Sequence, residues 1–190
     1  MNVIWACSLN TRQTHGNASS EWTALNAARC LHAFAAPSHV RVYPGAVKPL
    51  LLPPKHDPEI HGSDGLGGVE GLPDASDPQV QAFFALYEDG SHVRAIEGMA
   101  RCIKETWKGG AGEKVTIVSS GPMTNIALFV SAFPDLLEAV DEFVFMGGAI
   151  GAGNRSAVAE YNILTDRASA SPFHRQKARP FCQLMLPILQ

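Results

Sequence analysis

The chain has 190 residues, which is long enough for one domain with a sizeable core. Hydrophobic residues make up 46% of it and charged residues 17%, which is typical of a globular protein rather than a disordered one. The net charge of −3 gives no indication of nucleic-acid binding or of attraction to an anionic membrane. No apolar stretch approaches 18 residues, and no signal-peptide pattern opens the chain. The cysteines show no C-x-x-C pair, so we expect reduced thiols in a cytoplasmic protein (Cys7, Cys30, Cys102 and Cys182).

The first third of the chain contains two predicted strands and one predicted helix. Residues 2–8 are apolar and β-branched or aromatic, which favours a buried strand. Residues 19–36 carry apolar side chains at spacings of three and four, which predicts a helix that Ser19 or Ser20 caps. A second strand is expected at 40–43. The segment 44–78 that follows is rich in Pro, Gly and Asp and predicts a long loop, which in a compact domain is usually functional or disordered.

The second half of the chain alternates helices with strands. The predicted elements are an amphipathic helix at 92–108, a strand at 114–120, a helical region at 121–140 and a strand at 142–146. Pro122 suits a first helical position, and Pro134 divides the helical region into two pieces. The alternation predicts an α/β fold with an open, mostly parallel, Rossmann-like sheet and helices on both faces.

Ligands of such sheets bind at the carboxyl ends of the strands. The segments "SSG" after the third predicted strand and "MGG" after the fourth fall there, and so does "HGNAS" at 15–19. The stretch 143–166, "FVFMGGAIGAGNRSAVAEYNILTD", then presents two amides and a carboxylate at Asn154, Glu160 and Asn162. Because Glu160 and Asn162 are two residues apart, their side chains would share a face of an extended segment. This stretch is therefore the first candidate for a site.

Other interpretations of these residues stay open at this point. The glycines after 146 can form a simple flexible turn, Asn154 tolerates left-handed backbone angles, and Glu160 can be a solvated charge. A dinucleotide-binding loop is disfavoured, because "GGAIGAGN" does not fit G-x-G-x-x-G and no clear amphipathic helix follows. His61 alone is more typical of an ordinary loop histidine. Acidic and histidine residues near it have spacings that match no familiar metal site (His56, Asp57, Glu59, His61 and Asp64).

The order of several segments carries more information than any one of them. "THGNAS", "YPGAVKPLL", "IHGSDGLGG", "VSSGPMTNIAL", "FVFMGGAIGAGN" and "AEYNILTD" follow one another along residues 14–168. Together they resemble the inosine/uridine-preferring nucleoside hydrolase family. The resemblance implies hydrolysis of the N-glycosidic bond of purine or pyrimidine ribonucleosides to base and ribose. It also implies a bound Ca²⁺ that holds the ribose hydroxyls and the attacking water.

The resemblance also implies roles for individual residues. The ribose hydroxyls would be held by Asn154, Glu160 and Asn162, with Met146 near the sugar and Asn162 acting in catalysis. Asn17 would lie beside the metal-bound water, and His61 would line the sugar and base and act in catalysis. Ser120 would offer its main-chain carbonyl to Ca²⁺. Such residues suit glycoside cleavage, since hydrogen bonds to the sugar can strengthen as an oxocarbenium-like charge develops.

The two ends of the chain depart from the family pattern. The resemblance implies an aspartate cluster, D-x-D-x-x-x-D-D, before "HGN", but the only acidic residue before Asp57 is Glu21. It also implies a downstream His-Asp pair, whereas no acid follows Asp166. We therefore expect a divergent segment at 1–13, a partial hydrolase-like domain at 14–168 and a divergent tail at 169–190. Calcium binding should be weak or absent, because Ca²⁺ takes six to eight oxygen ligands.

Two functional hypotheses follow. In the first the protein is a ribonucleoside hydrolase. In the second it is an inactive, truncated homologue that at most binds a nucleoside or ribose or serves as an interaction module. Its expected partner in either case is a small ribonucleoside, with no nucleic acid and no membrane, and a homo-oligomer is compatible with the sequence.

Overall fold

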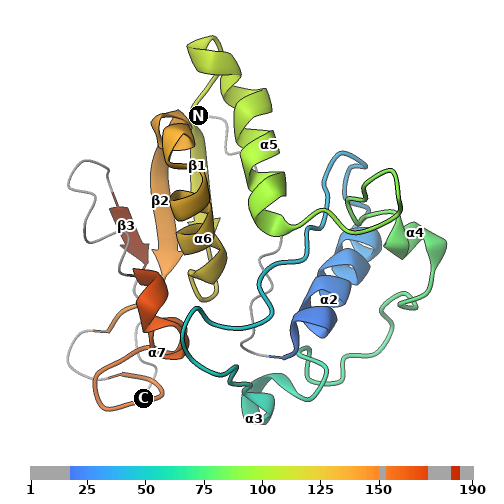
Figure 1. The fold of residues 1–190 in the computed structure, drawn as a ribbon. Helices are drawn as coiled ribbons and strands as arrows, with labels where there is room; N and C mark the ends of the chain where they lie inside the picture. The colour runs from blue at the N-terminus through green and yellow to red at the C-terminus, as the bar shows by residue number, and fades with distance from the viewer. Residues whose placement is uncertain (1–17, 150–152, 171–180, 185–190) are drawn as a thin grey trace.

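The computed structural model describes residues 18–149, 153–170 and 181–184. The α-helices are α2 (Ser20–Ala33), α3 (Pro58–His61), α4 (Pro78–Gln81), α5 (Ala95–Trp107), α6 (Thr124–Ala132) and α7 (Tyr161–Thr165). Three 3-10 helices are η1 (Lys108–Gly110), η2 (Pro134–Ala139) and η3 (Arg167–Ala170), and three strands are β1 (Val115–Ser119), β2 (Val140–Met146) and β3 (Phe181–Leu184). Figure 1 shows α2 and α4 on one side of the molecule, the strands on the other, and α3 at the bottom between them. The strand predicted at 2–8 lies outside the described residues.

The described strands form one parallel sheet in the order β1-β2-β3. Ser119 pairs with Phe145, so β1 and β2 end at the same edge of the sheet. Strand β3 pairs through Phe143 and Phe181 on the other side of β2. The parallel α/β arrangement confirms the predicted fold class. The sequence analysis expected one divergent tail at 169–190 and did not predict the strand at 181–184.

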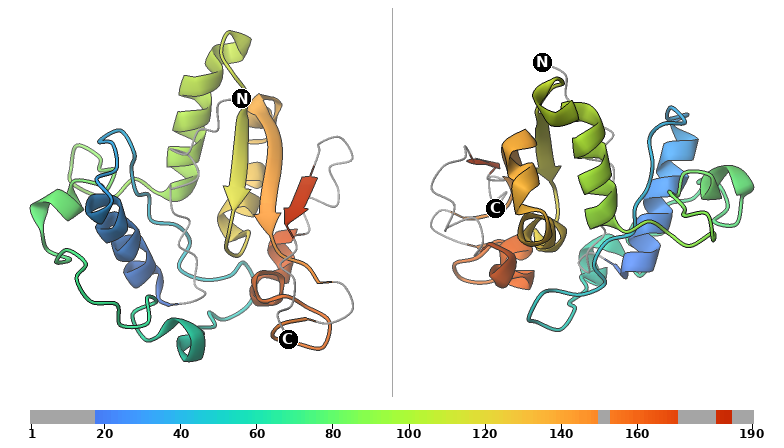
Figure 2. Two further views of the ribbon diagram at one scale, coloured as in Figure 1. Left: turned by 180° about the vertical axis from the view of Figure 1, so that it is seen from behind. Right: turned by 45° about the horizontal axis from the view of Figure 1, so that its top comes forward.

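Helices α5 and α6 pack on the sheet and on each other around the main core. Its buried side chains include Met99 and Ile103 of α5, Ile117 of β1, and Ile126 and Phe129 of α6. Each is at most 2% exposed, so together they form a dry interior that holds the two helices to the strands. In Figure 1 α6 lies in front of the strands, and the view from behind in Figure 2 places it behind them. The described residues thus show helices on one face of the sheet, and the expectation of helices on both faces stays a prediction for the other.

A second, smaller core lies under α2. Ala28 and Leu31 of that helix pack against Val42, Val80 and Phe84, which come from the next two segments of the chain. The predicted cap is confirmed, because Ser19 Oγ accepts a hydrogen bond from the Trp22 N–H at 3.3 Å. The apolar spacing of 19–36 therefore predicted the helix, but its buried face only in part, since Ala28 and Leu31 are buried whereas Trp22 and Ala35 are exposed.

Two local predictions were wrong. Residues 40–43 do not form a strand, since Val42 makes only an isolated parallel bridge to Phe84. Pro122 does not open a helix, because α6 begins at Thr124 and is capped at Met123. The division at Pro134 is confirmed, with η2 following α6 directly. Residues 40–43 failed to form a strand because a short apolar run forms one only where a continuous partner strand lies beside it.

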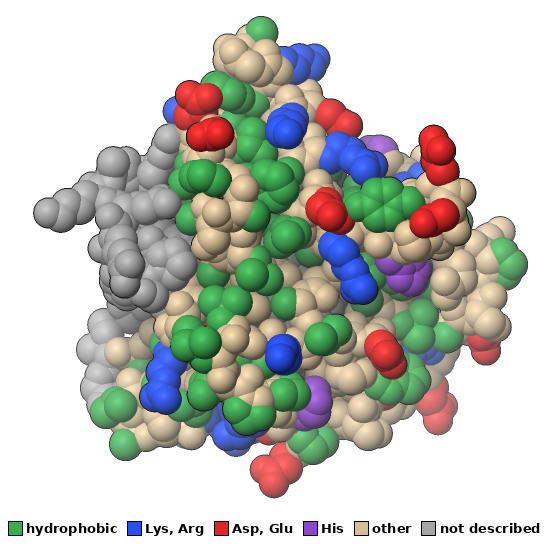
Figure 3. Space-filling view, viewed as in Figure 1, with side chains coloured by type: hydrophobic (Ala, Val, Ile, Leu, Met, Phe, Trp, Pro, Cys, Tyr) green, Lys and Arg blue, Asp and Glu red, His purple; other side chains and the backbone are tan. Residues whose placement is uncertain are grey.

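The surface carries charges of both signs. In Figure 3 the acidic and basic side chains are interspersed over the face that is seen in Figure 1. Among the residues that the structure describes, no helix is both long enough and apolar enough to span a membrane.

Candidate functional site

The carboxyl ends of β1 and β2 are joined by one side-chain amide. Asn162 Nδ2 donates hydrogen bonds to the Ser120 carbonyl at 3.2 Å and to the Met146 carbonyl at 2.9 Å. Both partners are acceptors, which fixes the orientation of the amide and directs its NH₂ group at the strand ends. The Asn162 Oδ1 atom accepts no hydrogen bond from the described part of the chain. Ser120, Met146 and Asn162 therefore lie together at the carboxyl edge of the sheet, where the sequence predicted the site.

Glu160 is held beside Asn162 by the start of a helix. It is the N-cap of α7, and its Oε2 accepts a hydrogen bond from the Asn162 N–H at 3.0 Å. The expectation that these two residues share a face of an extended segment was therefore wrong, because Asn162 is the second residue of α7. Their proximity comes from capping, in which a side chain satisfies a free N–H of the first helical turn. Figures 1 and 2 show α7 just beyond the carboxyl end of β2.

Asn154 completes this group from the loop before α7. Its Oδ1 accepts a hydrogen bond from the Tyr161 N–H at 2.9 Å, and its side chain acts to lower the pKa of Glu160. We call Ser120, Met146, Asn154, Glu160 and Asn162 the polar cluster. Five of the seven residues that were predicted for the site thus come together.

The Glu160 carboxyl is the one ionisable group of the polar cluster, and it is only 6% exposed. Burial raises its pKa above the ordinary 4.5 of a glutamic acid. Hydrogen bonds from the Asn162 and Ile163 N–H groups and from the Asn154 side chain oppose that rise in pKa. The cluster therefore presents a partly desolvated carboxylate that hydrogen bonds hold in place.

The two remaining predicted site residues lie elsewhere. His61 is the last residue of α3 and is half-buried, and within the described residues no hydrogen bond joins its side chain to the polar cluster. Asn17 lies outside the described residues. The sequence analysis missed Arg155, whose guanidinium pairs with Asp57 at 2.6 Å and so connects the loop of Asn154 to α3. A contact between residues 98 positions apart leaves no local signal in the sequence.

Asp166, which closes the predicted stretch, has a structural role. It is 1% exposed, and its Oδ2 accepts hydrogen bonds from the Thr124 hydroxyl at 2.5 Å and from the Leu50 N–H at 3.2 Å. Its Oδ1 accepts a hydrogen bond from the Ser169 N–H at 3.2 Å. These bonds satisfy a carboxylate that would be costly to bury alone, and they tie α6, residue 50 and η3 together.

The described residues do not fit a calcium site. The Ser120 carbonyl, which the sequence assigned to the metal, already accepts a hydrogen bond from Asn162. Across 18–149 and the shorter described segments, no group of three or more His, Cys, Asp or Glu side chains could hold a metal ion. Since Ca²⁺ needs several carboxylate or carbonyl oxygens, these residues alone supply too few ligands.

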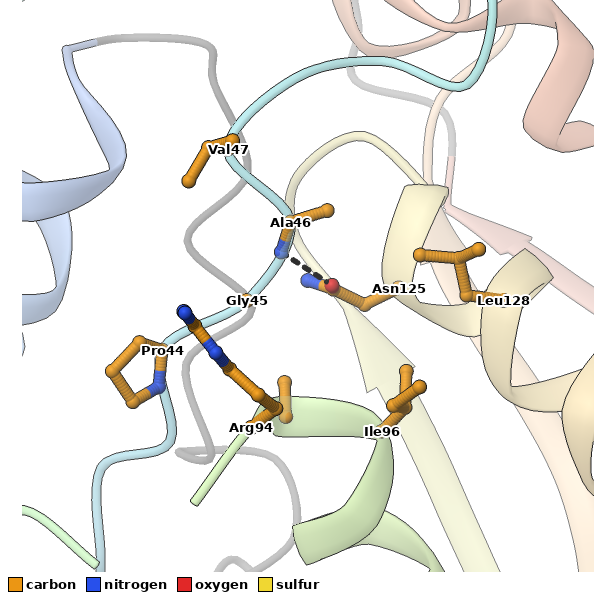
Figure 4. A pocket seen from close by; sticks show the side chains of 9 residues that line it. Pro44, Gly45, Ala46, Val47, Arg94, Ile96, Asn125 and Leu128 are labelled. Carbon is orange, nitrogen blue, oxygen red and sulfur yellow. Dashed lines mark hydrogen bonds between the residues drawn. The ribbon is translucent and has the colours of Figure 1, made fainter. Parts of the chain in front are cut away.

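A cavity of about 290 Å³ lies apart from the polar cluster, between residues 44–47 and the N-terminal ends of α5 and α6. Asn125 is directed at this segment, and its Oδ1 accepts a hydrogen bond from the Ala46 N–H at 2.8 Å (Figure 4). This bond gives Asn125 a structural role, since it holds residue 46 against the start of α6. The cavity walls are mainly apolar and include Pro44, Val47, Ile96 and Leu128.

Comparison with known proteins shows which family the sequence matches. The model of the family described as inosine-uridine preferring nucleoside hydrolase matches residues 11–187. A pyrimidine-specific ribonucleoside hydrolase, RihA of Salmonella paratyphi A, is 37% identical over 155 residues, which are 82% of this chain and 44% of the relative. An uncharacterized Schizosaccharomyces pombe protein is 33% identical over 164 residues, again 44% of its own length. The chain therefore spans less than half of these curated relatives.

Solved structures of nucleoside hydrolases superpose on this chain. A purine-preferring ribonucleoside hydrolase from Gardnerella vaginalis superposes with a TM-score of 0.72 at 25% identity, over 96% of this chain and 56% of that one. A plant nucleoside hydrolase superposes with a TM-score of 0.71 at 23% identity, which supports the fold. The family match covers most of the residues, and the polar cluster lies inside it. The chain belongs to the inosine-uridine preferring nucleoside hydrolase family.

Proposed function

We propose that the polar cluster holds the ribose of a ribonucleoside, as the sugar-binding part of a site for hydrolysis of the N-glycosidic bond. The observation that carries this proposal is the buried Glu160 carboxylate, whose Oε2 accepts a hydrogen bond from the Asn162 backbone N–H. A ribose presents hydroxyl donors, and a carboxylate is a strong acceptor for them. Asn162 adds an oriented Oδ1 acceptor, because its NH₂ group is occupied by the Ser120 and Met146 carbonyls.

The chemistry of the bond explains why a carboxylate belongs here. Cleavage of an N-glycosidic bond places positive charge on the sugar ring in the transition state. A fixed negative charge and oriented amide dipoles stabilise that charge more strongly than they stabilise the neutral ground state. Glu160 supplies the charge, and the hydrogen bonds at its Oε2 keep it in place. In the family Ca²⁺ supplies the activation of water, and the described residues do not provide for it.

The compartment and the class of base are further parts of the proposal. The cysteines are scattered along the sequence with no C-x-x-C pair, which supports a reducing, cytoplasmic environment. One named relative is pyrimidine-specific and another is purine-preferring, so both classes of nucleoside belong in the first binding test.

The proposal is tested by titrating the chain with uridine and inosine while protein resonances are followed by NMR. The same titration is made with the 2′-, 3′- and 5′-deoxynucleosides and with the free bases. We expect ribonucleosides to bind, and at least one deoxynucleoside to bind about tenfold more weakly, since a lost hydrogen bond to a charged acceptor costs about 1.5–3 kcal/mol. Glu160→Gln should weaken ribonucleoside binding, whereas Glu70→Gln, an exposed change, should not. Equal affinity for a nucleoside and for its free base would contradict the proposal.

A second candidate, nucleoside binding without hydrolysis, is favoured by one observation. The described residues contain no group of metal-ligating side chains, so they lack the means to activate water. Ribose release, measured in the same samples with a reducing-sugar assay, separates the two candidates. Binding with ribose release supports a hydrolase, and binding without it supports a sugar-binding protein.

A further inference from the structure

We propose that Arg155 is a positioning residue, whose ion pair with Asp57 fixes the position of α3 relative to the loop that carries Asn154 of the polar cluster. The inference rests on the proposed function, because the polar cluster is taken as the place where the sugar binds. It adds a residue pair that joins the segment from 55 to 61 to the loop of Asn154.

The geometry of the pair is that of a specific contact. The Arg155 Nε and Nη2 atoms lie 3.0 Å and 2.6 Å from the same carboxylate oxygen, Asp57 Oδ2. The side chains are 29% and 13% exposed, so both are largely withdrawn from water. A charge-assisted, two-donor contact with this little exposure is stronger than a typical surface ion pair, which contributes almost nothing.

A second contact joins the same two segments. The Tyr161 hydroxyl donates a hydrogen bond to the Lys55 carbonyl at 3.2 Å. Tyr161 follows Glu160 directly, and its N–H is bound by the side chain of Asn154, the residue before Arg155. Both contacts therefore start from residues adjacent to members of the polar cluster, and they end two residues apart in the segment that leads into α3. A displacement of that segment would therefore also displace Asn154 and Glu160.

Helix α3 depends on such contacts because little else holds it. It has only four residues and none of them is buried, so neither helix propensity nor a hydrophobic face fixes its position. Asp57 is its N-cap residue, and His61 is its last residue. Beyond His61 the chain is fixed again, where Asn26 Nδ2 of α2 donates to the Asp64 carbonyl at 2.6 Å. Figure 1 shows α3 between the α2 side and the α7 side of the molecule.

Hydrogen exchange of the ligand-free chain tests the positioning directly. The N–H groups of Ile60 and His61 bond to the Asp57 carbonyl, at 3.2 Å and 3.1 Å, and report on α3. In Arg155→Met we expect these amides to exchange about fivefold to tenfold faster, since local opening becomes easier when a contact that opposes it is lost. The control is Arg41→Met, which removes an arginine that donates to the Ala82 backbone carbonyl and not to Asp57. It should leave the exchange of α3 unchanged.

Three further variants separate the ion pair from general damage. Tyr161→Phe removes only the hydroxyl that bonds Lys55, and it should accelerate the same amides to a smaller extent. Arg155→Lys keeps the charge but not the two-donor geometry, so its effect should be intermediate. The exchanged pair, Arg155→Asp with Asp57→Arg, should restore slow exchange at least in part. A thermal melt of each variant shows whether it folds.

Nucleoside affinity then connects the pair to the site. In Arg155→Met we expect affinity for a ribonucleoside to fall about tenfold, because Arg155 and Tyr161, which hold the segment before α3, are adjacent to Asn154 and Glu160. Unchanged exchange in α3 would overturn the positioning role, whatever the chain binds. Faster exchange with unchanged nucleoside affinity would overturn the role in binding. If the unaltered chain binds no nucleoside, the proposed function fails, and the exchange data still decide whether Arg155 positions α3.

Discussion

Glu160 caps the helix that carries Asn162, and its Oε2 lies 3.0 Å from the Asn162 backbone nitrogen. The same Asn162 reaches back through its side chain to the ends of β1 and β2. One residue thereby joins the sheet edge to the carboxylate, and the helix start fixes the distance between them. A site built in this way is sensitive to the start of α7, because a shift of its first turn would move both side chains.

The first prediction concerns the amide that joins the strand ends. Asn162→Ala leaves the Ser120 and Met146 carbonyls without their donor, so we expect a loss of about 1–3 kcal/mol in the free energy of unfolding. Urea denaturation measures it. Gln81→Ala is the control, since it removes an amide that bonds the Ala75 carbonyl at an exposed position and should cost less than about 0.5 kcal/mol. Equal losses would show that Asn162 does not hold the strand ends.

The second prediction concerns pH. Burial raises the pKa of Glu160 in the folded chain above 4.5, so the folded state holds its proton to higher pH than the unfolded state does. The stability that this difference contributes is fully present below the unfolded pKa, and it is lost as pH rises through the folded pKa. Glu160→Gln should therefore remove part of the fall in stability with rising pH. Unfolding curves at pH values from about 4 to 7 measure this, with Glu70→Gln as the exposed control. Parallel pH profiles for the unaltered chain and Glu160→Gln would contradict it.

The sequence predicted the elements that local pattern decides. The apolar spacing of 19–36 and the β-branched run at 114–120 gave α2 and β1 nearly at their observed bounds. The sequence also placed Ser120 and Met146 at the same edge of the sheet, because neighbouring parallel strands have their carboxyl ends at one edge. The prediction at 40–43 failed, because the local pattern does not specify which segment lies beside Val42.

The arrangement of the candidate site was only partly predictable. Resemblance to a family identified Asn154, Glu160 and Asn162. The prediction of an extended segment was wrong, because the spacing of two between Glu160 and Asn162 does not reveal that Glu160 caps a helix. Arg155 and Asp57 were not linked by any motif, and their contact depends on where two distant loops meet. Such long-range polar pairs are a consequence of the folded arrangement and not of local propensity.

The third prediction concerns the close approach of Gly45 to Asn125. A methyl group on Gly45 would lie 2.4 Å from Asn125 Nδ2, and Asn125 is 1% exposed, so neither side has room to move (Figure 4). Gly45→Ala should therefore lower the free energy of unfolding by about 1–3 kcal/mol. Thermal and urea denaturation measure it.

Substitutions of Val47 and Asn125 provide the control for Gly45→Ala and test whether contact with Asn125 causes the loss of stability. Val47→Ala changes a side chain that is 62% exposed and should have little effect. In an Asn125→Ala background the added methyl group has space, so Gly45→Ala should cost less there than in the unaltered chain. Additive losses would mean that the contact with Asn125 is not the cause. Ribonucleoside affinity should stay unchanged in Asn125→Ala when the protein is folded, because Asn125 binds Ala46 and not the polar cluster.

The last prediction concerns calcium. The chain has no Asp or Glu before Glu21, and the described residues contain no group of three metal-ligating side chains. We therefore expect calcium at about 1 mM to raise the melting temperature by less than about 1 °C, since a ligand stabilises a fold only in proportion to its occupancy. The chain should also release no ribose from inosine or uridine, because loss of the general base and of the metal each lowers the rate by about 10²-fold or more. Magnesium at the same concentration controls for ionic strength. Ribose release that a chelator abolishes would contradict the prediction, and it would show that residues outside the described ranges complete a metal site beside the Ser120 carbonyl.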